Sequence, residues 1–346
     1  MQLIYTPKQE YKVLVRCFTF NHCRYIEDAL NGFALQQTNF PFVCLVVDDC
    51  STDGEQDVIK AWLERECDMS RAEHTELELS NIILVPHRAN KRCTFAFYLL
   101  KQNLYGTSKK KSLVAPWRIC CEYEALCEGD DYWTDSLKLQ RQCDVMDNNN
   151  ECVMCLHQTI TSKDGDVKSV LPRQELAEGW LDKNKYFRKT EIMQFQLSSY
   201  FMRISVLNEF LKCSHEFMKP TGTGDIQYLL YFLAVGEVYF LNKVMSTYRL
   251  SVENGWSHTV INNKEKRIGH YRRLSKMYSS YDDFTVGTYH EYCLYKQKKC
   301  NFLIERSNGN YKILFTKEYR ECLRSEKWSV QIRMVFQYIK QILKGK

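Results

Sequence analysis

The sequence predicts an α/β protein with a mixed, mainly parallel sheet flanked by helices, followed by a helical C-terminal appendage. Two observations lead to this fold class. Short apolar runs alternate with helix-like segments in the first part of the chain, and acidic clusters directly follow two of the apolar runs. With 346 residues the chain exceeds one average domain. We therefore expect an α/β domain over residues 1–260 and a basic, mainly helical region over residues 261–346.

The first elements alternate between strand and helix. Residues 11–18 are rich in β-branched and aromatic types and predict a strand. Residues 24–37 carry apolar side chains at helical spacing, and residues 42–47 are apolar throughout, as in a strand buried on both faces. A helix near residues 58–63 and a strand over residues 81–86 continue the pattern. Strands that alternate with helices in this way predict right-handed crossovers.

The middle of the chain is interpreted in the same way. A helix over residues 91–112 is expected to end in a basic loop, residues 109–111, which is either solvated or in contact with phosphate. Further expected elements are strands over residues 123–127, 152–157 and 196–202, helices over residues 136–146, 204–211 and 226–233, a turn over residues 161–167, and a glycine-punctuated loop over residues 220–225.

Three carboxylates, Glu128, Asp130 and Asp131, surround Gly129 directly after the apolar strand at residues 123–127. Acids this close repel one another, and a shared divalent cation with oxygen ligands relieves the repulsion. A cation held in this way keeps positions free for a diphosphate. The alternative is a solvated turn that caps the next helix, because Asp and Gly favour turns and caps.

Polar clusters follow three expected strands, at residues 19–22, 48–53 and 128–131. The carboxyl ends of parallel strands lie at one edge of a sheet, where ligands bind, so we expect the three clusters to converge. A dinucleotide-binding unit would need glycines in its first turn, and residues 18–25 contain none. Binding of NAD is therefore disfavoured.

Composition narrows the class of protein. The N-terminal residues lack an apolar signal segment and no apolar run approaches the length of a spanning helix, so a cytoplasmic protein is expected. Many of the sixteen cysteines lie within apolar runs and are expected to be buried and reduced. The one CxxC, Cys152 to Cys155, lacks a second pair at a spacing suited to zinc.

Basic residues are concentrated at the C-terminal end. Residues 264–346 contain about 19 basic and about 8 acidic side chains. The last segment, residues 327–346, places Trp328, Ile332, Val335, Ile339 and Ile342 on one helical stripe. This stripe is expected to pack on the protein's own core or on a partner subunit, and peripheral contact with a membrane is the alternative. A nucleic-acid partner would show steep salt dependence and is not expected.

Several motifs in this order resemble those of the family 2 glycosyltransferases, which have the GT-A fold. They are Arg16 to His22, Asp48 to Gly54, Glu128 to Trp133, Gly224-Asp225 and Tyr248-Arg249. The resemblance covers about residues 11–260. It implies an inverting transfer of a sugar from a nucleotide-diphosphate donor to a hydroxyl of a glycan or lipid-linked acceptor, in surface polysaccharide or glycoconjugate synthesis.

The resemblance also implies roles for single residues. Thr19, Asp48 and Asp49 would hold the nucleoside, with Asp49 on the base, and Asp225 would be the catalytic base. Glu128 stands where the family commonly has Asp, so its contribution is open. The donor-binding residues expected are Thr19, Asn21, Asp48, Asp49, Asp53, Glu128 and Asp130, and the expected ligands of Mn²⁺ or Mg²⁺ are Asp130 and Asp131.

The chemistry fits these residue types. The departing diphosphate needs its charge neutralised, which a divalent cation does as a Lewis acid. The acceptor hydroxyl needs a carboxylate base, and a hydrolase pair flanking one glycosidic bond is not evident in the sequence. From the residues alone, Asp225 is either the N-cap of the next helix or such a base. A protein that binds a nucleotide sugar without turnover is the alternative function.

Overall fold

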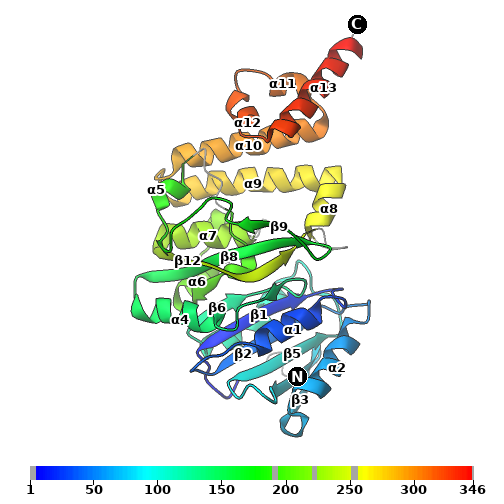
Figure 1. The fold of residues 1–346 in the computed structure, drawn as a ribbon, viewed down its shortest axis with the longest axis vertical. Helices are drawn as coiled ribbons and strands as arrows, with labels where there is room; N and C mark the ends of the chain where they lie inside the picture. The colour runs from blue at the N-terminus through cyan, green and yellow to red at the C-terminus, as the bar shows by residue number, and fades with distance from the viewer. Residues whose placement is uncertain (1–4, 189–193, 220–223, 251–255, 345–346) are drawn as a thin grey trace. The chain divides into compact units, whose positions relative to one another are not determined.

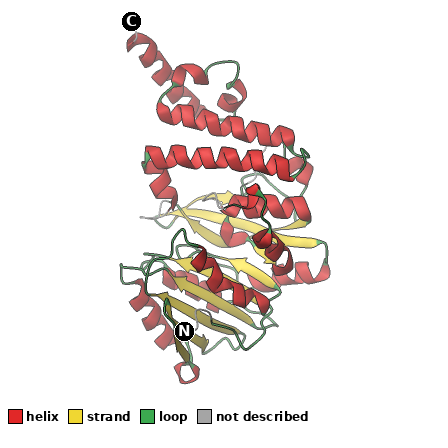
Figure 2. Ribbon diagram, turned by 180° about the vertical axis from the view of Figure 1, so that it is seen from behind, coloured by secondary structure: helices red, strands yellow, loops and turns green. Residues whose placement is uncertain are grey.

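The computed structural model describes residues 5–188, 194–219, 224–250 and 256–344 (Figures 1 and 2). The chain forms two packing units that are interleaved in sequence. One consists of Met1–Leu181, Met193–Leu211 and Val235–Val252, and the other of Asp182–Ile192, Lys212–Ala234 and Glu253–Lys346. The division at residue 260 expected from the sequence stays a prediction.

A sheet forms the centre of the first unit. Within the described residues it has twelve strands, and its main path runs in the order β10-β12-β8-β11-β6-β1-β2-β5-β4-β3. β7 pairs with β12, and β9 pairs with β8. The strands are β1 Val13–Thr19, β2 Phe42–Asp48, β3 Glu73–Glu76, β4 Ser80–Pro86, β5 Cys93–Leu100, β6 Tyr123–Leu126, β7 Tyr132–Trp133, β8 Cys152–Lys163, β9 Asp166–Leu171, β10 Gly179–Trp180, β11 Phe201–Arg203 and β12 Glu237–Arg249.

The middle of the sheet is parallel. β1 pairs in parallel with both β2 and β6, and β2 pairs in parallel with β5. Antiparallel strands flank this group, with β4 against β5 and β11 against β6. The predicted mixed, mainly parallel α/β sheet is therefore confirmed. Because β1, β2 and β6 run in the same direction, their carboxyl ends lie at one edge of the sheet.

Helices cover both faces of the parallel group. On one face α1 (Ile26–Ala34), α2 (Glu55–Glu66) and α4 (Lys138–Asn148) pack against alternate strand residues in one buried apolar cluster. On the other face α3 (Ser108–Ile119) packs in a second buried cluster. Successive strand residues point to opposite faces, so an all-apolar strand such as β2 contributes to both clusters.

The helix expected over residues 91–112 is wrong. Residues Cys93–Leu100 form β5, a strand inside the sheet that is buried along nearly all its length. A short apolar run fits the spacing of a buried helix and of a buried strand equally well, and its aromatic residues favoured the strand. The basic residues 109–111 lie in the first turn of α3 and not in a loop.

Two smaller expectations also need correction. Residues 196–202 were expected to be one strand, but Leu197–Ser199 form a 3₁₀ turn and the strand β11 follows at Phe201–Arg203. The strand expected over residues 81–86 exists as β4, yet it is antiparallel to its neighbour β5. It therefore does not extend the parallel group by a crossover.

The second unit is mostly helical. α9 (Lys264–Phe284) and α10 (His290–Asn308) lie side by side (Figures 1 and 2). The other helices of this unit are α5 Lys183–Tyr186, α7 Gly224–Val235, α8 Trp256–Asn262, α11 Tyr311–Leu314, α12 Arg320–Arg324 and α13 Trp328–Lys344, while α6 Ile204–Lys212 lies mainly in the first unit. Among the described residues, no helix combines the length and the apolar character needed to cross a membrane.

A lysine is buried in the core of the first unit. The Lys138 side chain is fully buried, its ammonium lies 4.0 Å from the centroid of the Trp133 ring, and it donates a hydrogen bond of 2.7 Å to Gln142 Oε1. Burial lowers the pKa of Lys138 to about 7. Between this pKa and the ordinary lysine value the unfolded chain binds one more proton than the folded chain. The free-energy cost of burying Lys138 therefore falls, and the folded state becomes more stable, as the pH rises.

Replacement of Lys138 by Met should remove this pH dependence. Between pH 7 and pH 8.5 we expect the free energy of unfolding of the wild type, relative to Lys138→Met, to rise by on the order of 1 kcal/mol per pH unit. Urea denaturation at both pH values measures the difference. Lys298→Met, at an exposed position of α10, is the control and should follow the wild type. Parallel pH profiles for Lys138→Met and the wild type would contradict the prediction.

Candidate functional site

Three polar segments meet at the carboxyl edge of the parallel strands. Thr19, the last residue of β1, lies in register with Asp48 of β2, and the backbone N–H of Asp49 donates to the carbonyl of Thr19 at 3.0 Å. Beyond β6 the chain stays beside β1, because the N–H of Gly129 donates to the carbonyl of Phe18 at 3.1 Å. The structure thus brings together residues 19–22, 48–55 and 128–131, which we call the rim.

The closest approach in the rim is between Gly129 and Thr19. A Cβ atom at residue 129 would lie 2.1 Å from Thr19 Oγ1 and 2.6 Å from Thr19 Cβ. Side chains do not approach one another so closely, so only glycine fits at this position. Gly129 therefore sets how near the three carboxylates of residues 128–131 come to the end of β1.

Glu55 is the residue that ties two of the segments together, and the sequence did not single it out. Its carboxylate accepts hydrogen bonds from the Thr19 hydroxyl, from the backbone N–H of His22 at 2.9 Å and from the Ser51 hydroxyl at 2.8 Å. Burial raises the pKa of Glu55, and the three hydrogen bonds oppose the rise. An acid in the first turn of a helix is usually explained by its favourable interaction with the helix dipole. The sequence therefore gave no signal that Glu55 connects two segments of the rim.

The two acids after β2 differ in what they contact. The carboxylate of Asp49 accepts the N–H of Leu104 at 2.6 Å and the ammonium of Lys110 at 2.9 Å, so both its oxygens have partners. One oxygen of Asp48 accepts from Ser51 N–H at 3.2 Å. Its other oxygen, Oδ2, is buried without a hydrogen-bond partner among the described residues. Asp48 therefore has the free acceptor among the described residues, although the family resemblance implied Asp49 for contact with a base.

Asn21 and Asp53 stabilise the turns of the rim. The side-chain carbonyl of Asn21 accepts the N–H of Thr52 at 2.8 Å. Asp53 accepts the N–H of Cys23 at 2.9 Å and that of Glu55 at 3.1 Å. Partial burial raises the pKa of Asp53, but these hydrogen bonds outweigh it and the pKa is lowered. Both residues lie in the rim, and their expected role in binding a donor stays a prediction.

Within the described chain, the carboxylates of Glu128 and Asp130 accept no hydrogen bond from a backbone N–H or a hydroxyl group. No described residue forms a hydrogen bond or ion pair with the Glu128 carboxylate, and Asp130 lies 3.8 Å from His22 Nε2 as its one ion-pair partner in the described chain. Burial raises the pKa of Glu128, Asp130 raises it further, and Arg16 and Lys110 oppose the rise. His22 in turn contacts the Thr19 hydroxyl at 3.2 Å, so Asp130 is linked through it to the end of β1.

Asp131 is buried and is held by Arg249 at the end of β12. It accepts the backbone N–H of Arg249 at 2.9 Å, and the Arg249 guanidinium donates to the carbonyl of Asp130 at 2.8 Å. The same guanidinium lies over the Tyr132 ring and pairs with Asp28. Burial and the neighbouring Asp130 raise the pKa of Asp131 well above its usual value. Arg249 thereby fixes the position of the acidic segment.

Positive charge lies close to the acids. The Phe18 ring has the Arg16 guanidinium 4.6 Å and the Lys110 ammonium 4.7 Å from its centroid. Arg16 donates to the buried Glu124 at 2.7 Å. Lys110 comes from the basic run at residues 109–111, which was expected to be either solvated or in contact with phosphate, so its contact with Asp49 was not predicted. Two cationic side chains, each paired with a carboxylate, thus lie near the rim and oppose the rise in the pKa of Glu128.

A divalent cation fits the chemistry of the rim acids. Among the described residues no three His, Cys, Asp or Glu side chains already form a ligand set. However, the mutual repulsion of Glu128, Asp130 and Asp131 contributes to the raised pKa values of Glu128 and Asp131. Carboxylate oxygens are the preferred ligands of Mg²⁺, which also retains water or phosphate oxygens. Asp130 and Asp131 would hold such an ion.

Asp225 belongs to the other packing unit. It lies in the first turn of α7, and burial raises its pKa, while backbone N–H groups, that of Ile226 first, oppose the rise. Burial raises the pKa of the Tyr186 hydroxyl, and the negative charge of Asp225 raises it further. The preceding loop, residues 220–223, lies outside the described residues. Its expected role as the base stays a prediction.

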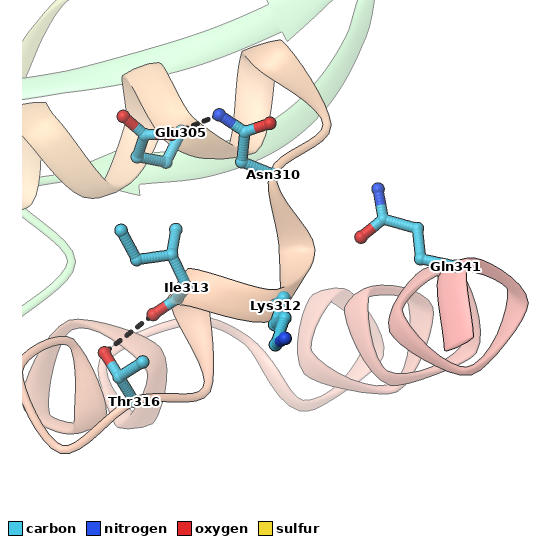
Figure 3. A pocket seen from close by; sticks show the side chains of 6 residues that line it. All are labelled: Glu305, Asn310, Lys312, Ile313, Thr316 and Gln341. Carbon is cyan, nitrogen blue, oxygen red and sulfur yellow. Dashed lines mark hydrogen bonds between the residues drawn. The ribbon is translucent and has the colours of Figure 1, made fainter. Parts of the chain in front are cut away.

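A hollow of about 490 Å³ lies among the C-terminal helices (Figure 3). Two of its polar side chains donate to neighbouring groups, Asn310 to the Glu305 carboxylate and Thr316 to the carbonyl of Ile313. None of the predicted site residues lines it; the lining residues are Glu305, Asn310, Lys312, Ile313, Thr316 and Gln341. We therefore do not assign the chemistry of the rim to this hollow.

Comparison with known proteins bears mainly on the fold. The chain resembles TarS of S. aureus (residues 1–349) solved with UDP-GlcNAc, with a TM-score of 0.56 and 16% identity over 91% of this chain and 79% of TarS. TarS without this ligand gives a TM-score of 0.53 and 15% identity over 91% and 78%. The sheet and helices match the GT-A-like fold of glycosyltransferases. The mannosyltransferase PcManGT of Pyrobaculum calidifontis, solved with GDP-Man and Mn²⁺, is more distant, with a TM-score of 0.46 and 12% identity over 99% and 90%.

Sequence comparison adds relatives without a stated activity. No family model matches the chain. Uncharacterized proteins of Mycobacterium tuberculosis and Mycobacterium bovis are 26% identical to it over 256 residues, which are 72% of this chain and 61% of each relative. The chain thus spans less than two thirds of the length of the curated relatives it matches.

Proposed function

We propose that the protein is an inverting glycosyltransferase that moves a sugar from a nucleotide-diphosphate donor to a hydroxyl acceptor. The observation that carries this proposal is the rim, where Glu128, Asp130 and Asp131 lie beside the ends of β1 and β2. A parallel sheet binds nucleotides at this edge. The likeness of the fold to TarS, which was solved with UDP-GlcNAc, supports a nucleotide sugar as the ligand.

The rim would divide its residues between the two halves of the donor. Thr19 and the acids after β2 would contact the nucleoside, with Asn21 and Asp53 shaping the turns around it. The free Oδ2 of Asp48 is suited to accept a hydrogen bond from a ring N–H or a ribose hydroxyl. Glu128 and Asp130 would lie at the diphosphate, where Asp130 and Asp131 would hold Mn²⁺ or Mg²⁺.

Transfer then requires that the charge of the departing diphosphate be neutralised and that the acceptor hydroxyl lose its proton. The bound cation would neutralise the charge of the departing diphosphate. Asp225 would accept the proton of the acceptor hydroxyl as it attacks the sugar from the opposite face, for a contribution of about 10²–10⁴-fold. One base and one displacement imply inversion. The acceptor class we propose is a glycan or a lipid-linked sugar in polysaccharide or glycoconjugate synthesis.

Thermal unfolding with a panel of nucleotide-diphosphate sugars, each with and without Mn²⁺, tests the donor site. We expect one donor to raise the melting temperature by several degrees, because a ligand at 100 times its Kd adds about 2.7 kcal/mol of stability. Mn²⁺ should strengthen the shift more at pH 7.5 than at pH 5. Burial and Asp130 raise the pKa of Asp131, so this proposed ligand becomes protonated at a higher pH than an ordinary Asp, and a protonated carboxyl binds a cation less well.

Matched variants locate the effect. Asp130→Asn should abolish the Mn²⁺-dependent part of the shift, whereas Asp166→Asn, at an exposed position of β9, should leave it intact. Equal shifts in all three proteins would contradict the proposed metal position. Product analysis then separates enzyme from binder: donor binding without release of nucleotide, with any acceptor, would favour a nucleotide-sugar-binding protein without turnover.

A further inference from the structure

Helix α13 (Trp328–Lys344) packs on its own unit with only one face. Met334 is buried, Val330 packs against the same apolar cluster, and the Tyr338 ring stacks on Phe315 with centroids 4.9 Å apart. These three residues are spaced by four and therefore lie on one side of the helix. This face of α13 supplies the contacts of the helix with the apolar cluster of its own unit.

The remaining large apolar residues of α13 are exposed. The stripe of the sequence analysis, Trp328, Ile332, Val335, Ile339 and Ile342, was expected to pack on the protein's own core or on a partner, and the first of these expectations is wrong. We define the outer face of α13 as this stripe together with Phe336 and Leu343. Trp328 is 76% exposed, Phe336 62% and Leu343 67%. At about 100° per residue the seven side chains share one arc of the helix.

The charges on α13 have one sign. Trp328–Lys344 contains no Asp or Glu. Arg333 and Lys340 are exposed, form no ion pair within the described chain, and lie on the helix between the outer face and the buried face. Lys327, also exposed, directly precedes the helix. An exposed apolar arc bordered by basic residues without acids is complementary to an anionic, apolar surface.

We propose that the outer face of α13 docks on an anionic lipid bilayer, with the helix lying in the plane of the interface. The apolar side chains would enter the acyl boundary while Arg333 and Lys340 reach the lipid phosphates with their long side chains. A second copy of the chain fits less well, because a two-fold interface would bring the same basic residues of both copies together without acids. This surface is independent of the donor site.

Cosedimentation of the full chain with vesicles tests the proposal. One set of vesicles contains phosphatidylcholine with roughly one third phosphatidylglycerol, an anionic lipid. These vesicles should bind the protein at least about tenfold better than vesicles of phosphatidylcholine alone. Added salt should weaken binding, since it screens the basic residues. The fluorescence of Trp328 should shift to shorter wavelength on binding, and Trp328→Phe should lose this part of the shift.

Matched substitutions make the proposal falsifiable. Ile332→Asp/Phe336→Asp and Arg333→Glu/Lys340→Glu should each abolish binding to anionic vesicles, while Leu294→Asp and Lys298→Glu on α10 should not. Circular dichroism checks that every variant remains folded. Equal binding by the α13 variants and the wild type overturns the proposal. A dimer by light scattering that Ile332→Asp/Phe336→Asp dissociates, without binding of the wild type to vesicles, also overturns it and assigns the face to a second copy.

Discussion

Asp225→Asn should retain donor affinity and lose transfer by about 10²–10⁴-fold. Asn keeps the size of the side chain, and its amide oxygen can accept the backbone N–H of Ile226 in place of the carboxylate, so the first turn of α7 should persist. The variant lacks only the carboxylate that would take the acceptor proton. Calorimetry with the donor identified in the panel gives the affinity, and nucleotide release at saturating donor and acceptor gives kcat.

The pH dependence of transfer separates a base from a structural residue. Burial raises the pKa of Asp225, so the rate of the wild type should fall already in mildly acidic buffer as this carboxylate becomes protonated. The residual rate of Asp225→Asn should not show this decline. Asp182→Asn is the matched control, because Asp182 caps α5 by accepting the N–H of Lys185 at 3.1 Å. Wild-type turnover in Asp225→Asn would exclude Asp225 from the mechanism.

The position of the rim could be predicted from local features of the sequence. β2 is apolar up to Asp48, and β1 (up to Thr19) and β6 are apolar except for Arg16 and Glu124, a buried pair that forms one ion pair, because these strands are covered on both faces. Each is followed by polar residues that cannot remain in the core. The direction of the strands then decides that the three polar segments meet, and the alternation with helices predicted that direction.

The network that holds the rim could not be predicted, since it depends on partners far apart in the chain. Arg249 is 118 residues from Asp131, and Lys110 is 61 residues from Asp49. Nothing in the residues near Lys110 distinguishes it from a solvated lysine. For the same reason the periodicity of α13 predicted an amphipathic helix but not which of its two apolar faces is buried. Val330, Met334 and Tyr338 form the buried face, which the sequence did not select.

Gly129→Ala should displace residues of the rim and lower both the stability of the protein and its affinity for the donor. The new Cβ would overlap Thr19 Oγ1 and Cβ, so either β1 or the acidic segment has to move. Movement of Thr19 breaks its hydrogen bond to Glu55 and its contact with His22. We expect a loss of about 1–3 kcal/mol in the free energy of unfolding, as overpacking of a tight site produces. Donor affinity should fall at least about tenfold, because Thr19 and Asp130 both lie at the displaced position.

Gly269→Ala provides the comparison for the same chemical change. Its added Cβ lies 3.4 Å from the guanidinium end of the Arg273 side chain in α9, a distance close to ordinary van der Waals contact. Alanine also favours a helix interior by up to about 1 kcal/mol relative to glycine. Urea denaturation and donor titration should therefore show equal or higher stability and unchanged affinity for Gly269→Ala. If Gly129→Ala matched it in both measurements, the close packing of Gly129 on Thr19 would not control the donor site, and the rim would tolerate a wider spacing between its acids and β1.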